Sequence, residues 1–546
     1  SKGRSKEEVK PSESRKRCRE YAQHWVNIQS KEFQRLGIVG DWENPYLTMK
    51  PESEAIICEE LLKIASTGQL YRGSKPIMWS PVEQTALAEA EVEYKDKRAT
   101  QIYVKFPISN ATAFTDYEES LSCASVVIWT TTPWTIPANR AVSFSSKIKY
   151  SIYEVTQIED SDFEPWTKCG DKLIVADDLW QSVAKAGLIK SYKKLIEIPS
   201  KDIQGFVLSH PLKNMDGAEG KYDFIVPLLE GSHVTAETGS GFVHTAPSHG
   251  EDDYVVWVSN QNKIESLGIN PMVPMTLDDA GCYTDVMPSR FKGLDVIRTS
   301  GKKRGQDGKA NNEVLKALVE CGNLLSRGII TLRDAHSWRS KAPVIRRATP
   351  QWFISMSKKG LREKALEAID KTKFWPERGR NRITSMVADR PDWLISRQRS
   401  WGVPITLIIG PNGELHTDRP DAENINNRIL DAVRKFGVDG WFDTSLEKFI
   451  PNAGDGWHKV NDILDVWFDS GCTHAFCLKT RSDLPDRADL YLEGSDQHRG
   501  WFQSSLLESC AVYGEAPYDG VLTDGFVVDD KGFKMSKSLG NTMSPE

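Results

Sequence analysis

The chain has 546 residues, 39% of them hydrophobic and 27% charged, with a net charge of −6. This length is too great for a single hydrophobic core, so we expect about two to four domains. The composition is that of a globular protein. The negative net charge gives no general affinity for polyanions, so any nucleic-acid or nucleotide site would have to be a local basic surface.

The cysteines and the hydropathy pattern exclude several classes of protein. The nine cysteines form no C-x-x-C pair, which argues against a disulfide framework and a zinc knuckle, and unpaired thiols fit a reducing compartment. Cys472, His474 and Cys477 lie close in sequence, but their spacing is not a standard ligand set and packing is the favoured role. No apolar run approaches the ~20 residues of a membrane span.

The first part of the chain predicts helices and then a long β-rich region. A helix is expected through Phe33 and an amphipathic helix over residues 52–65. From Ala99 to Arg333, short β-type runs separated by Gly, Pro, Asn and Asp predict an inserted domain of roughly 235 residues. These runs are 102–106, 125–129, 150–155, 172–175 and 224–228.

Helices and parallel-type strands return from Trp338 onwards, which is typical of an α/β layer fold. Residues 464–468 and 488–492 are predicted buried strands, and 501–510 is the predicted helix after the second strand. The sequence therefore predicts a core in two parts, residues 1–98 and 336–546, around an insert spanning residues 99–335.

A polar cluster follows the predicted strand at 488–492. In an open parallel sheet, ligands bind at the carboxyl ends of the strands. Glu493 can accept a hydrogen bond from an amine, Gly494 lets the backbone approach a ligand, and Asp496 or Gln497 can hold a ribose or adenine edge. The structural alternative is that Asp496 caps a helix and Trp501 belongs to the core.

A second motif near the end of the chain, Lys534-Met535-Ser536-Lys537-Ser538, places two ammonium groups three residues apart among hydroxyl residues. Such a loop suits a polyphosphate whose charge must be held while a bond breaks. A solvated basic turn is the alternative.

Two segments of the insert carry candidate chemistry. Thr130, Thr131 and Thr132 are followed by Pro133, which should end the strand and leave the hydroxyls at a loop edge. The Gly-bounded loop 239–253 contains His244 and Asp253 among its histidines and acids. A strand without function and a metal centre are the alternatives, the latter weakened by the lack of ligand spacing. We interpret the pair as a pocket that binds an ammonium group and positions water.

Several motifs together resemble the isoleucyl-tRNA synthetases, a family of class Ia aminoacyl-tRNA synthetases. They are 349–353, 397–404, 465–471, 492–501 and 534–538, and the resemblance extends over the whole chain. It implies an α/β fold, with a Rossmann-type parallel-sheet core interrupted by a β-rich editing domain. The run Thr-Thr-Thr-Pro-Trp at 130–134 matches the isoleucyl form, whereas valyl and leucyl relatives usually carry Thr-Thr-Arg-Pro.

The resemblance also implies roles for individual residues. In the core, Glu493, Gly494, Asp496 and Gln497 would hold ATP or the aminoacyl-adenylate, Trp467 and Trp501 would line the side-chain pocket, and Lys534 and Lys537 would act on ATP. In the insert, Thr130, Thr131 and Thr132 would cradle the adenosine end and position water. His244 would shape the pocket against the correct amino acid, and Asp253 would anchor the substrate's α-ammonium group.

The implied activity is ATP-dependent attachment of isoleucine to tRNA(Ile), with hydrolytic editing of valine. ATP with Mg²⁺ is the expected cofactor, and the partners are tRNA(Ile) and isoleucine. We expect a monomer without a membrane span in the cytoplasm, or in the mitochondrial matrix of a eukaryote. No bound metal is expected, including zinc at 78–84, where many bacterial relatives carry a Cys pair.

One departure from the family matters. No His-x-Gly-His sequence occurs in the chain, and no helical anticodon-binding region follows the basic loop. We therefore expect an excised fragment that cannot make aminoacyl-adenylate and retains at most editing. The alternatives are a stand-alone hydrolase of mischarged tRNA and a non-catalytic tRNA-binding relative.

Overall fold

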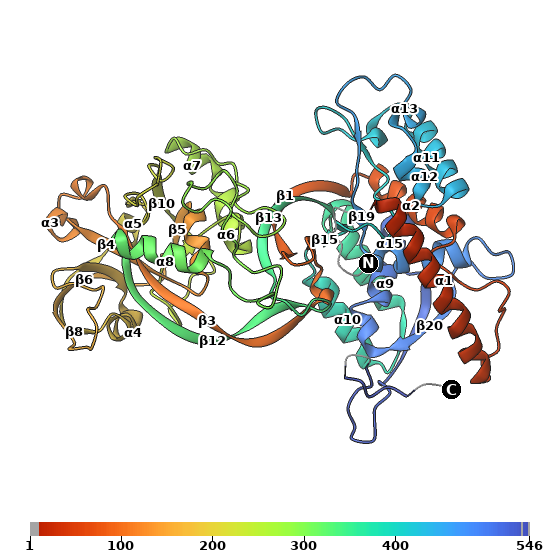
Figure 1. Cartoon of the computed structure of the whole chain (residues 1–546), viewed down its shortest axis with the longest axis horizontal. Helices are drawn as coiled ribbons and strands as arrows, with labels where there is room; N and C mark the ends of the chain where they lie inside the picture. Colours follow the sequence, from red (N-terminus) through yellow and green to blue (C-terminus); the bar gives the residue numbers. More distant parts are fainter. Residues whose placement is uncertain (1–9, 537–538, 544–546) are drawn as a thin grey trace. The chain divides into compact units, whose positions relative to one another are not determined.

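The computed structural model describes residues 10–536 and 539–543, so Lys537 and Ser538 of the basic motif lie outside the described residues. The chain divides into two compact units (Figure 1). We call Ser1–Gly73 with Gln351–Glu546 the core unit, and Ser74–Pro350 the insert unit.

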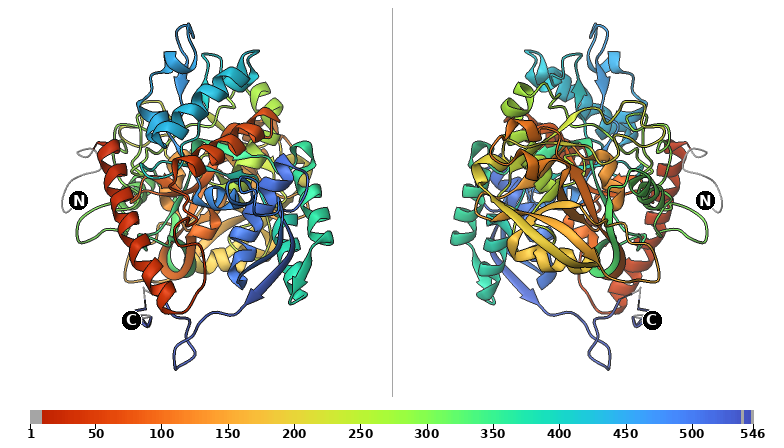
Figure 2. Two further views of the ribbon diagram at one scale, coloured as in Figure 1. Left: turned by 90° about the vertical axis from the view of Figure 1, so that its right-hand side faces the viewer. Right: turned by 90° about the vertical axis from the view of Figure 1, so that its left-hand side faces the viewer.

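The core unit is built on a parallel sheet in the order β14-β21-β20. Its strands are β14 (Lys373–Trp375), β20 (Ala488–Gly494) and β21 (Tyr518–Asp524). Glu493 pairs with Thr523 and Gly494 with Asp524, so β20 and β21 end at the same edge. Helices pack around this sheet (Figures 1 and 2). The parallel sheet with its helices confirms the α/β fold class.

The remaining elements of the core unit are mainly helices. They are α1 (Pro11–Arg35), α2 (Pro51–Ser66), α9 (Leu361–Lys371), α10 (Arg378–Ala388), α11 (Ala422–Phe436), α12 (Asp439–Asp443), α13 (Leu446–Phe449), α14 (Val466–Gly471) and α15 (Trp501–Val512). Short strand pairs are β16 (Ser396–Arg397) with β19 (Ile463–Leu464), and β17 (Ile408–Ile409) with β18 (His458–Lys459). Helix α2 is buried along most of its length and packs on α11 and α15.

One predicted strand of the core unit is wrong. Residues 464–468 do not continue as a strand, because β19 ends at Leu464 and α14 begins at Val466. Asp465 caps this helix, since its carboxylate accepts a hydrogen bond from the Trp467 N–H at 3.3 Å. The apolar run fits either a buried strand or a buried helix, and the cap decides in favour of the helix.

The neighbouring predictions for 488–492 and 501–510 are confirmed as β20 and α15. However, β20 is not a buried strand, since Leu490 and Leu492 are 42% and 57% exposed.

The insert unit contains two sheets, in the orders β12-β3-β4-β7-β6-β8 and β11-β5-β10-β9. Its long strands β3 (Val92–Pro107) and β12 (Leu324–Ser337) form an antiparallel ribbon (Figure 1). The other strands of the two sheets are β4 (Ala124–Thr130), β5 (Ala141–Phe144), β6 (Tyr150–Ile158), β7 (Lys172–Ala176), β8 (Ile189–Ile198), β9 (Val207–Ser209), β10 (Ile225–Glu230) and β11 (Val243–Thr245). The β-type runs predicted from the sequence all fall on or overlap these strands.

Short helices connect the strands of the insert unit. They are α3 (Glu118–Leu121), α4 (Trp180–Ala186), α5 (Ser200–Ile203), α6 (Glu251–Ser259), α7 (Gln261–Ser266) and α8 (Ala310–Glu320). The chain enters this unit through β1 (Leu70–Ser80), which pairs with β2 (Thr85–Ala86), and leaves it through β13 (Ile345–Ile354), which pairs with β15 (Trp393–Leu394). Among residues 10–536 and 539–543, no helix is long and apolar enough to cross a bilayer.

Candidate functional site

A cavity of about 440 Å³ opens in the insert unit. Its walls come from the Thr-rich segment after β4, from the segment around β11 and the start of α6, and from β1, β3, β12 and β13. The lining residues that matter below are Thr130, Thr132, Trp134, Thr135, His244, His249, Gly250 and Asp253, with Met78, Tyr94, Arg333, Asp334, Ala335, Val344, Ile345 and Arg346 on the other side.

The Thr-rich segment forms a compact array of hydroxyl groups. Strand β4 ends at Thr130, shortly before Pro133, as the proline predicts, and a 3-10 helix begins at Pro133. The Thr132 hydroxyl lies 3.2 Å from the Thr130 hydroxyl and 3.3 Å from that of Thr135. Thr130 and Thr132 line the cavity, and Thr131 is not among its lining residues. This alternation follows from the period of two of extended backbone.

His244 is held by a directed series of hydrogen bonds. The Asn139 amide nitrogen donates to the Ala141 carbonyl at 2.7 Å and to His244 Nδ1 at 2.8 Å. Nδ1 therefore accepts, and Nε2 carries the proton that it donates to the Thr135 hydroxyl at 2.9 Å. Thr135 in turn donates to the Thr132 carbonyl at 2.8 Å. Burial lowers the pKa of His244 to about 3, so the ring is neutral.

His249 is the second imidazole in the cavity wall. Its Nδ1 lies 2.9 Å from the Arg346 carbonyl and its Nε2 lies 2.8 Å from the Thr276 hydroxyl. The Trp134 ring meets it edge-on, with 4.9 Å between ring centroids. Burial lowers the pKa of His249 to about 4, so this ring is neutral as well.

Asp253 is the acidic group on the side of the cavity that carries the two histidines. It lies in the first turn of α6, and its carboxylate accepts a hydrogen bond from the Ala246 N–H at 2.9 Å. Gly250 makes this approach possible, because a Cβ atom there would lie 2.3 Å from Asp253 Oδ2. Burial raises the pKa of Asp253 to about 7. A carboxylate in this state gains from pairing with a cation, since an opposite charge favours ionisation.

The cavity therefore combines two carboxyl groups, those of Asp253 and Asp334, with two arginines, two neutral imidazoles, hydroxyls and aromatic rings. This arrangement can bind an ammonium group at Asp253 and hold a water molecule or an ester among the hydroxyls. Within the described part of the chain, no group of three or more His, Cys, Asp or Glu residues could hold a metal ion.

A second polar cluster lies at the strand edge of the core unit. Glu493 and Asp496 are exposed there, and Gly494 N–H donates to the Glu493 carboxylate at 3.1 Å. Phe526 lies 3.8 Å from where a Cβ atom at Gly494 would be. The Lys534 ammonium sits 3.4 Å from the Phe526 ring centroid. The structure thus brings the first lysine of the basic motif to the polar end of β20.

Trp467 and Trp501 lie next to each other beside this edge. A Cβ atom at Gly500 would come within 2.7 Å of the Trp467 ring and 2.5 Å of the Gln497 amide oxygen, so only glycine fits. Trp501 Nε1 donates to the Ser470 carbonyl at 3.1 Å, and its backbone N–H donates to Gln497 at 3.0 Å. The Trp501 ring stacks on Tyr491 with 4.0 Å between centroids. Both indoles are only partly buried.

Comparison with known proteins assigns the chain to a family. The profile of the class I tRNA synthetases (I, L, M and V) matches residues 1–546. The chain belongs to this family. Isoleucine–tRNA ligases of Brucella abortus and Caulobacter vibrioides are each 51% identical to it, and that of Bradyrhizobium diazoefficiens is 49% identical. All of this chain is covered, but only 55–56% of each relative, so the chain spans about half their length.

For this member of the class I synthetases, the structure brings residues of the predicted motifs together in each unit, but the motifs do not include every residue of the insert-unit cavity. In the insert unit, Thr135, Asn139 and His249 lie within or beside the motifs, and only the hydrogen bonds show that they belong to the site. The opposite wall, with Met78, Tyr94 and Arg333, gives no sequence signal, because it is brought in by β1, β3 and β12 from distant segments.

Proposed function

We propose that the cavity of the insert unit hydrolyses the ester of valine wrongly attached to tRNA(Ile). The observation that carries this proposal is the joint position of Asp253, the Thr130–Thr135 hydroxyls and His244 around one cavity. One methylene group changes binding in a hydrophobic pocket too little to separate valine from isoleucine, so a synthetase gains from a second, smaller site that removes the error.

Each residue has a role in this proposal. The Asp253 carboxylate binds the substrate's α-ammonium group and so orients the ester. The hydroxyls of Thr130 and Thr132 contact the adenosine end and hold the attacking water. Thr131 helps to position the same groups. His244 limits the size of the amino-acid side chain, because its hydrogen bonds to Asn139 and Thr135 hold the ring in one orientation.

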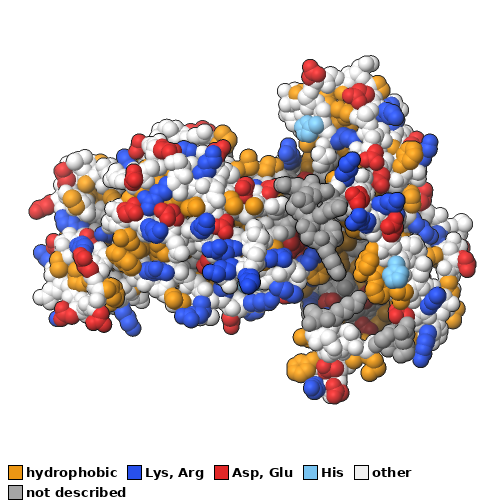
Figure 3. All heavy atoms as spheres, viewed as in Figure 1, with side chains coloured by type: hydrophobic (Ala, Val, Ile, Leu, Met, Phe, Trp, Pro, Cys, Tyr) orange, Lys and Arg blue, Asp and Glu red, His pale blue; other side chains and the backbone are white. Residues whose placement is uncertain are grey.

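A basic surface on the insert unit supports a polynucleotide substrate. In Figure 3, lysine and arginine side chains gather over the part of this unit where the β3–β12 ribbon lies. The exposed basic residues of the ribbon include Lys95, Arg98, Arg327 and Arg333. Phosphate groups that pair with such residues release their condensed counterions, which favours binding at low salt, so binding should weaken as salt increases.

The test measures release of valine from Val-tRNA(Ile) by the wild-type chain and by Asp253→Ala. We expect the variant to lose about 100-fold or more in kcat/KM, as when one charged orienting contact is removed. Equal rates for the two proteins would refute the assignment. Asp252→Ala is the matched control, because Asp252 is an exposed acid in the same helical turn and does not line the cavity.

We propose a separate role for the core unit in the longer protein. Its strand edge would bind ATP, with Mg²⁺, and the isoleucyl-adenylate through Glu493, Gly494, Asp496 and Gln497, with Lys534 and Lys537 on the phosphates and Trp467 and Trp501 around the side chain. ATP would supply the phosphoanhydride bond that is broken when the isoleucyl-adenylate forms. The whole protein would be an isoleucine–tRNA ligase of the cytoplasm or the mitochondrial matrix, acting as a monomer.

The proposals for the insert unit and for the core unit can be tested separately. We expect these 546 residues to hydrolyse Val-tRNA(Ile) but to show no isoleucine-dependent pyrophosphate exchange. The sequence motif His-x-Gly-His is not among them, and a synthetic site without it lacks part of its nucleotide contacts. Robust pyrophosphate exchange by the chain would refute this expectation.

A further inference from the structure

Two turns of the insert unit have the same backbone form. One runs from Ser80 to Gln84 between β1 and β2, and the other runs from Ser337 to Lys341 between β12 and β13. In each, the N–H of the fifth residue donates to the carbonyl of the first, at 2.7 Å and 2.9 Å. The fifth residue is left-handed in both, with φ of 52° at Gln84 and 58° at Lys341. We call them the paired turns.

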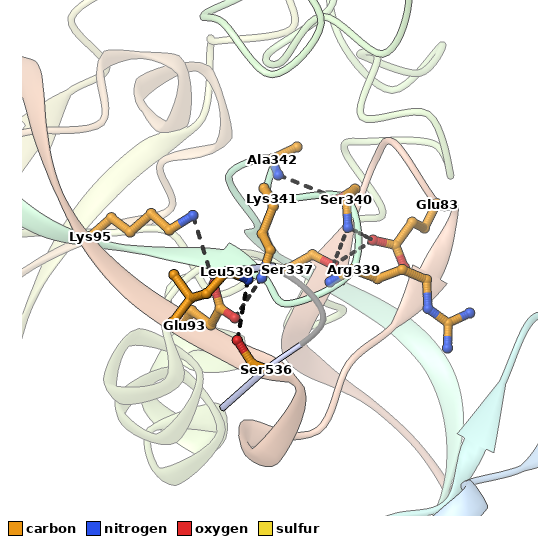
Figure 4. Close-up of polar contacts among 10 residues, drawn as sticks. All are labelled: Glu83, Glu93, Lys95, Ser337, Arg339, Ser340, Lys341, Ala342, Ser536 and Leu539. Atoms are coloured by element: carbon orange, nitrogen blue, oxygen red, sulfur yellow. Dashed lines mark hydrogen bonds and ion pairs between the residues drawn. The ribbon is translucent and has the colours of Figure 1, made fainter. Parts of the chain in front are cut away.

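Glu83 joins the paired turns. Its carboxylate accepts hydrogen bonds from the Ser337 hydroxyl and from the Ser340 N–H, the latter at 3.3 Å (Figure 4). Its own N–H donates to the Ser80 hydroxyl at 3.2 Å. The Ser337 hydroxyl also accepts from the Arg339 N–H at 3.2 Å. The polar groups of both turns therefore converge on one carboxylate and two hydroxyls.

The groups that meet come from the first and fourth residues of each turn, Ser80, Glu83, Ser337 and Ser340. Ser340 contributes its N–H, and its hydroxyl accepts from the Ala342 N–H at 3.4 Å. Two turns that each present their first and fourth residues have the spacing with which proteins hold tetrahedral zinc. The donor set does not fit that metal, because serine hydroxyls are not among its usual ligands and Glu83 is the single ionisable member.

We propose that the Glu83 carboxylate links the paired turns through its hydrogen bonds, as a metal ion does where ligands have this spacing. We call this link the clasp. Glu83 is thereby a positioning residue for one wall of the cavity. Hydrogen bonds to an ionised acceptor are about twice as strong as neutral ones, which suits a group that must hold two turns. The consequence for hydrolysis rests on the function proposed above for the cavity, whereas the clasp itself does not.

The strands next to the paired turns carry one side of the cavity. Met78 lies in β1 just before the first turn, and residues 333–335 lie in β12 just before the second. Residues 344–346 follow the second turn, and Tyr94 pairs with Ala335 across the ribbon. Movement of the turns would therefore shift this wall. The other wall, with Thr130, His244 and Asp253, lies on β4, β11 and α6 and would keep its geometry.

The experiment compares wild type with Glu83→Ala and Glu83→Gln. In Glu83→Ala, we expect amide hydrogen exchange at Ser340 to accelerate about 10-fold or more, because the N–H loses the Glu83 carboxylate and keeps only the Ser337 hydroxyl, at 3.4 Å, as an acceptor. We expect KM for Val-tRNA(Ile) to rise about 5-fold with kcat within about 2-fold, because a wall that only contacts substrate affects ground-state binding. Glu83→Gln keeps one acceptor oxygen and should lie between the two proteins in both measurements.

Lys341→Gln is the matched control. It removes the ion pair between Lys341 and Glu93 at 2.6 Å, which is exposed and lies in the same turn (Figure 4). Exposed pairs contribute little, so exchange at Ser340 and KM should stay at wild-type values. Unchanged exchange at Ser340 in Glu83→Ala would overturn the clasp. Faster exchange with an unchanged KM would overturn the positioning role, and faster exchange in a chain with no hydrolysis would support the clasp while refuting the proposed function.

A gain-of-function variant tests the geometry directly. Replacement of Ser80, Glu83, Ser337 and Ser340 by cysteine should create a site for one Zn²⁺, detectable with Co²⁺ by its tetrahedral thiolate spectrum. Added Zn²⁺ should slow exchange in the turns back towards the wild-type rate. If the folded variant bound no metal tetrahedrally, the paired turns would not converge as we propose.

Discussion

Asp253→Asn should make the chain more stable while abolishing hydrolysis. The ordinary pKa of an aspartate is 3.8, and burial raises that of Asp253 to about 7. A difference of this size corresponds to at most roughly 4 kcal/mol against ionisation in the folded state. Solvent screening at this partly exposed carboxyl reduces the effect, so we expect about 1–3 kcal/mol. An asparagine oxygen can still accept the hydrogen bond from Ala246 N–H, so the helix start is kept.

The pH dependence of the stability difference between Asp253→Asn and wild type follows from the raised pKa of Asp253. The folded chain holds the Asp253 proton up to about pH 7, whereas the unfolded chain releases it near 3.8. The wild-type penalty is therefore absent at low pH, grows as pH rises from 4 to 7, and is constant above that. The asparagine variant carries no such penalty, so its advantage should be small at pH 5 and largest at pH 8.

The measurement is urea unfolding followed by circular dichroism at pH 5 and pH 8, with wild type, Asp253→Asn and the exposed neighbour Asp252→Asn as control. The control should change the free energy of unfolding by less than about 0.5 kcal/mol at either pH. If Asp253→Asn were no more stable than wild type at pH 8, the burial argument for this carboxyl would be refuted.

Three further substitutions test other parts of the two sites. Gly250→Ala places a Cβ atom 2.3 Å from Asp253 Oδ2, so it should lower kcat/KM for Val-tRNA(Ile) about as much as Asp253→Ala in a deacylation assay. Asn139→Asp should reverse the His244 tautomer, because a carboxylate accepts from Nδ1–H, and ¹⁵N NMR of the ring would detect the change. Gly500→Ala should destabilise the core unit by about 1–3 kcal/mol, measured as a lower Tm with altered tryptophan fluorescence, because its Cβ overlaps the Trp467 ring. An unaltered imidazole spectrum, or a Gly250→Ala or Gly500→Ala variant identical to wild type, would contradict the corresponding geometry.

The sequence predicted the features that depend on local chemistry. Pro133 stops β4 and leaves Thr132 at a loop edge, so a short-range pattern was sufficient there. The helix that begins at Glu251 was not predicted, because residues 239–253 were interpreted as a loop. The run 464–468 was assigned to a strand because apolar residues alone do not distinguish buried strands from buried helices. The decisive contact is the Asp465 cap on Trp467 N–H, which is visible only when the backbone is known.

In the insert unit, contacts between segments far apart in the sequence could not be predicted. Glu83 and Ser337 are 254 positions apart, and nothing in either segment indicates that they meet. The same holds for Tyr94 and Ala335, which are paired by the register of the β3–β12 ribbon. Strand register depends on the whole hydrophobic pattern and on turn geometry, so one wall of the cavity could not be derived from motifs.

The hydrogen bonds of His244 also limit how water can be activated in the cavity. A general base needs a free lone pair and a pKa near the working pH. In His244, Nδ1 already accepts from Asn139, Nε2 carries the proton given to Thr135, and burial lowers the pKa to about 3. The ring therefore cannot collect a proton from water. The pH–rate profile of hydrolysis should show the titration of Asp253 and no step from an imidazole.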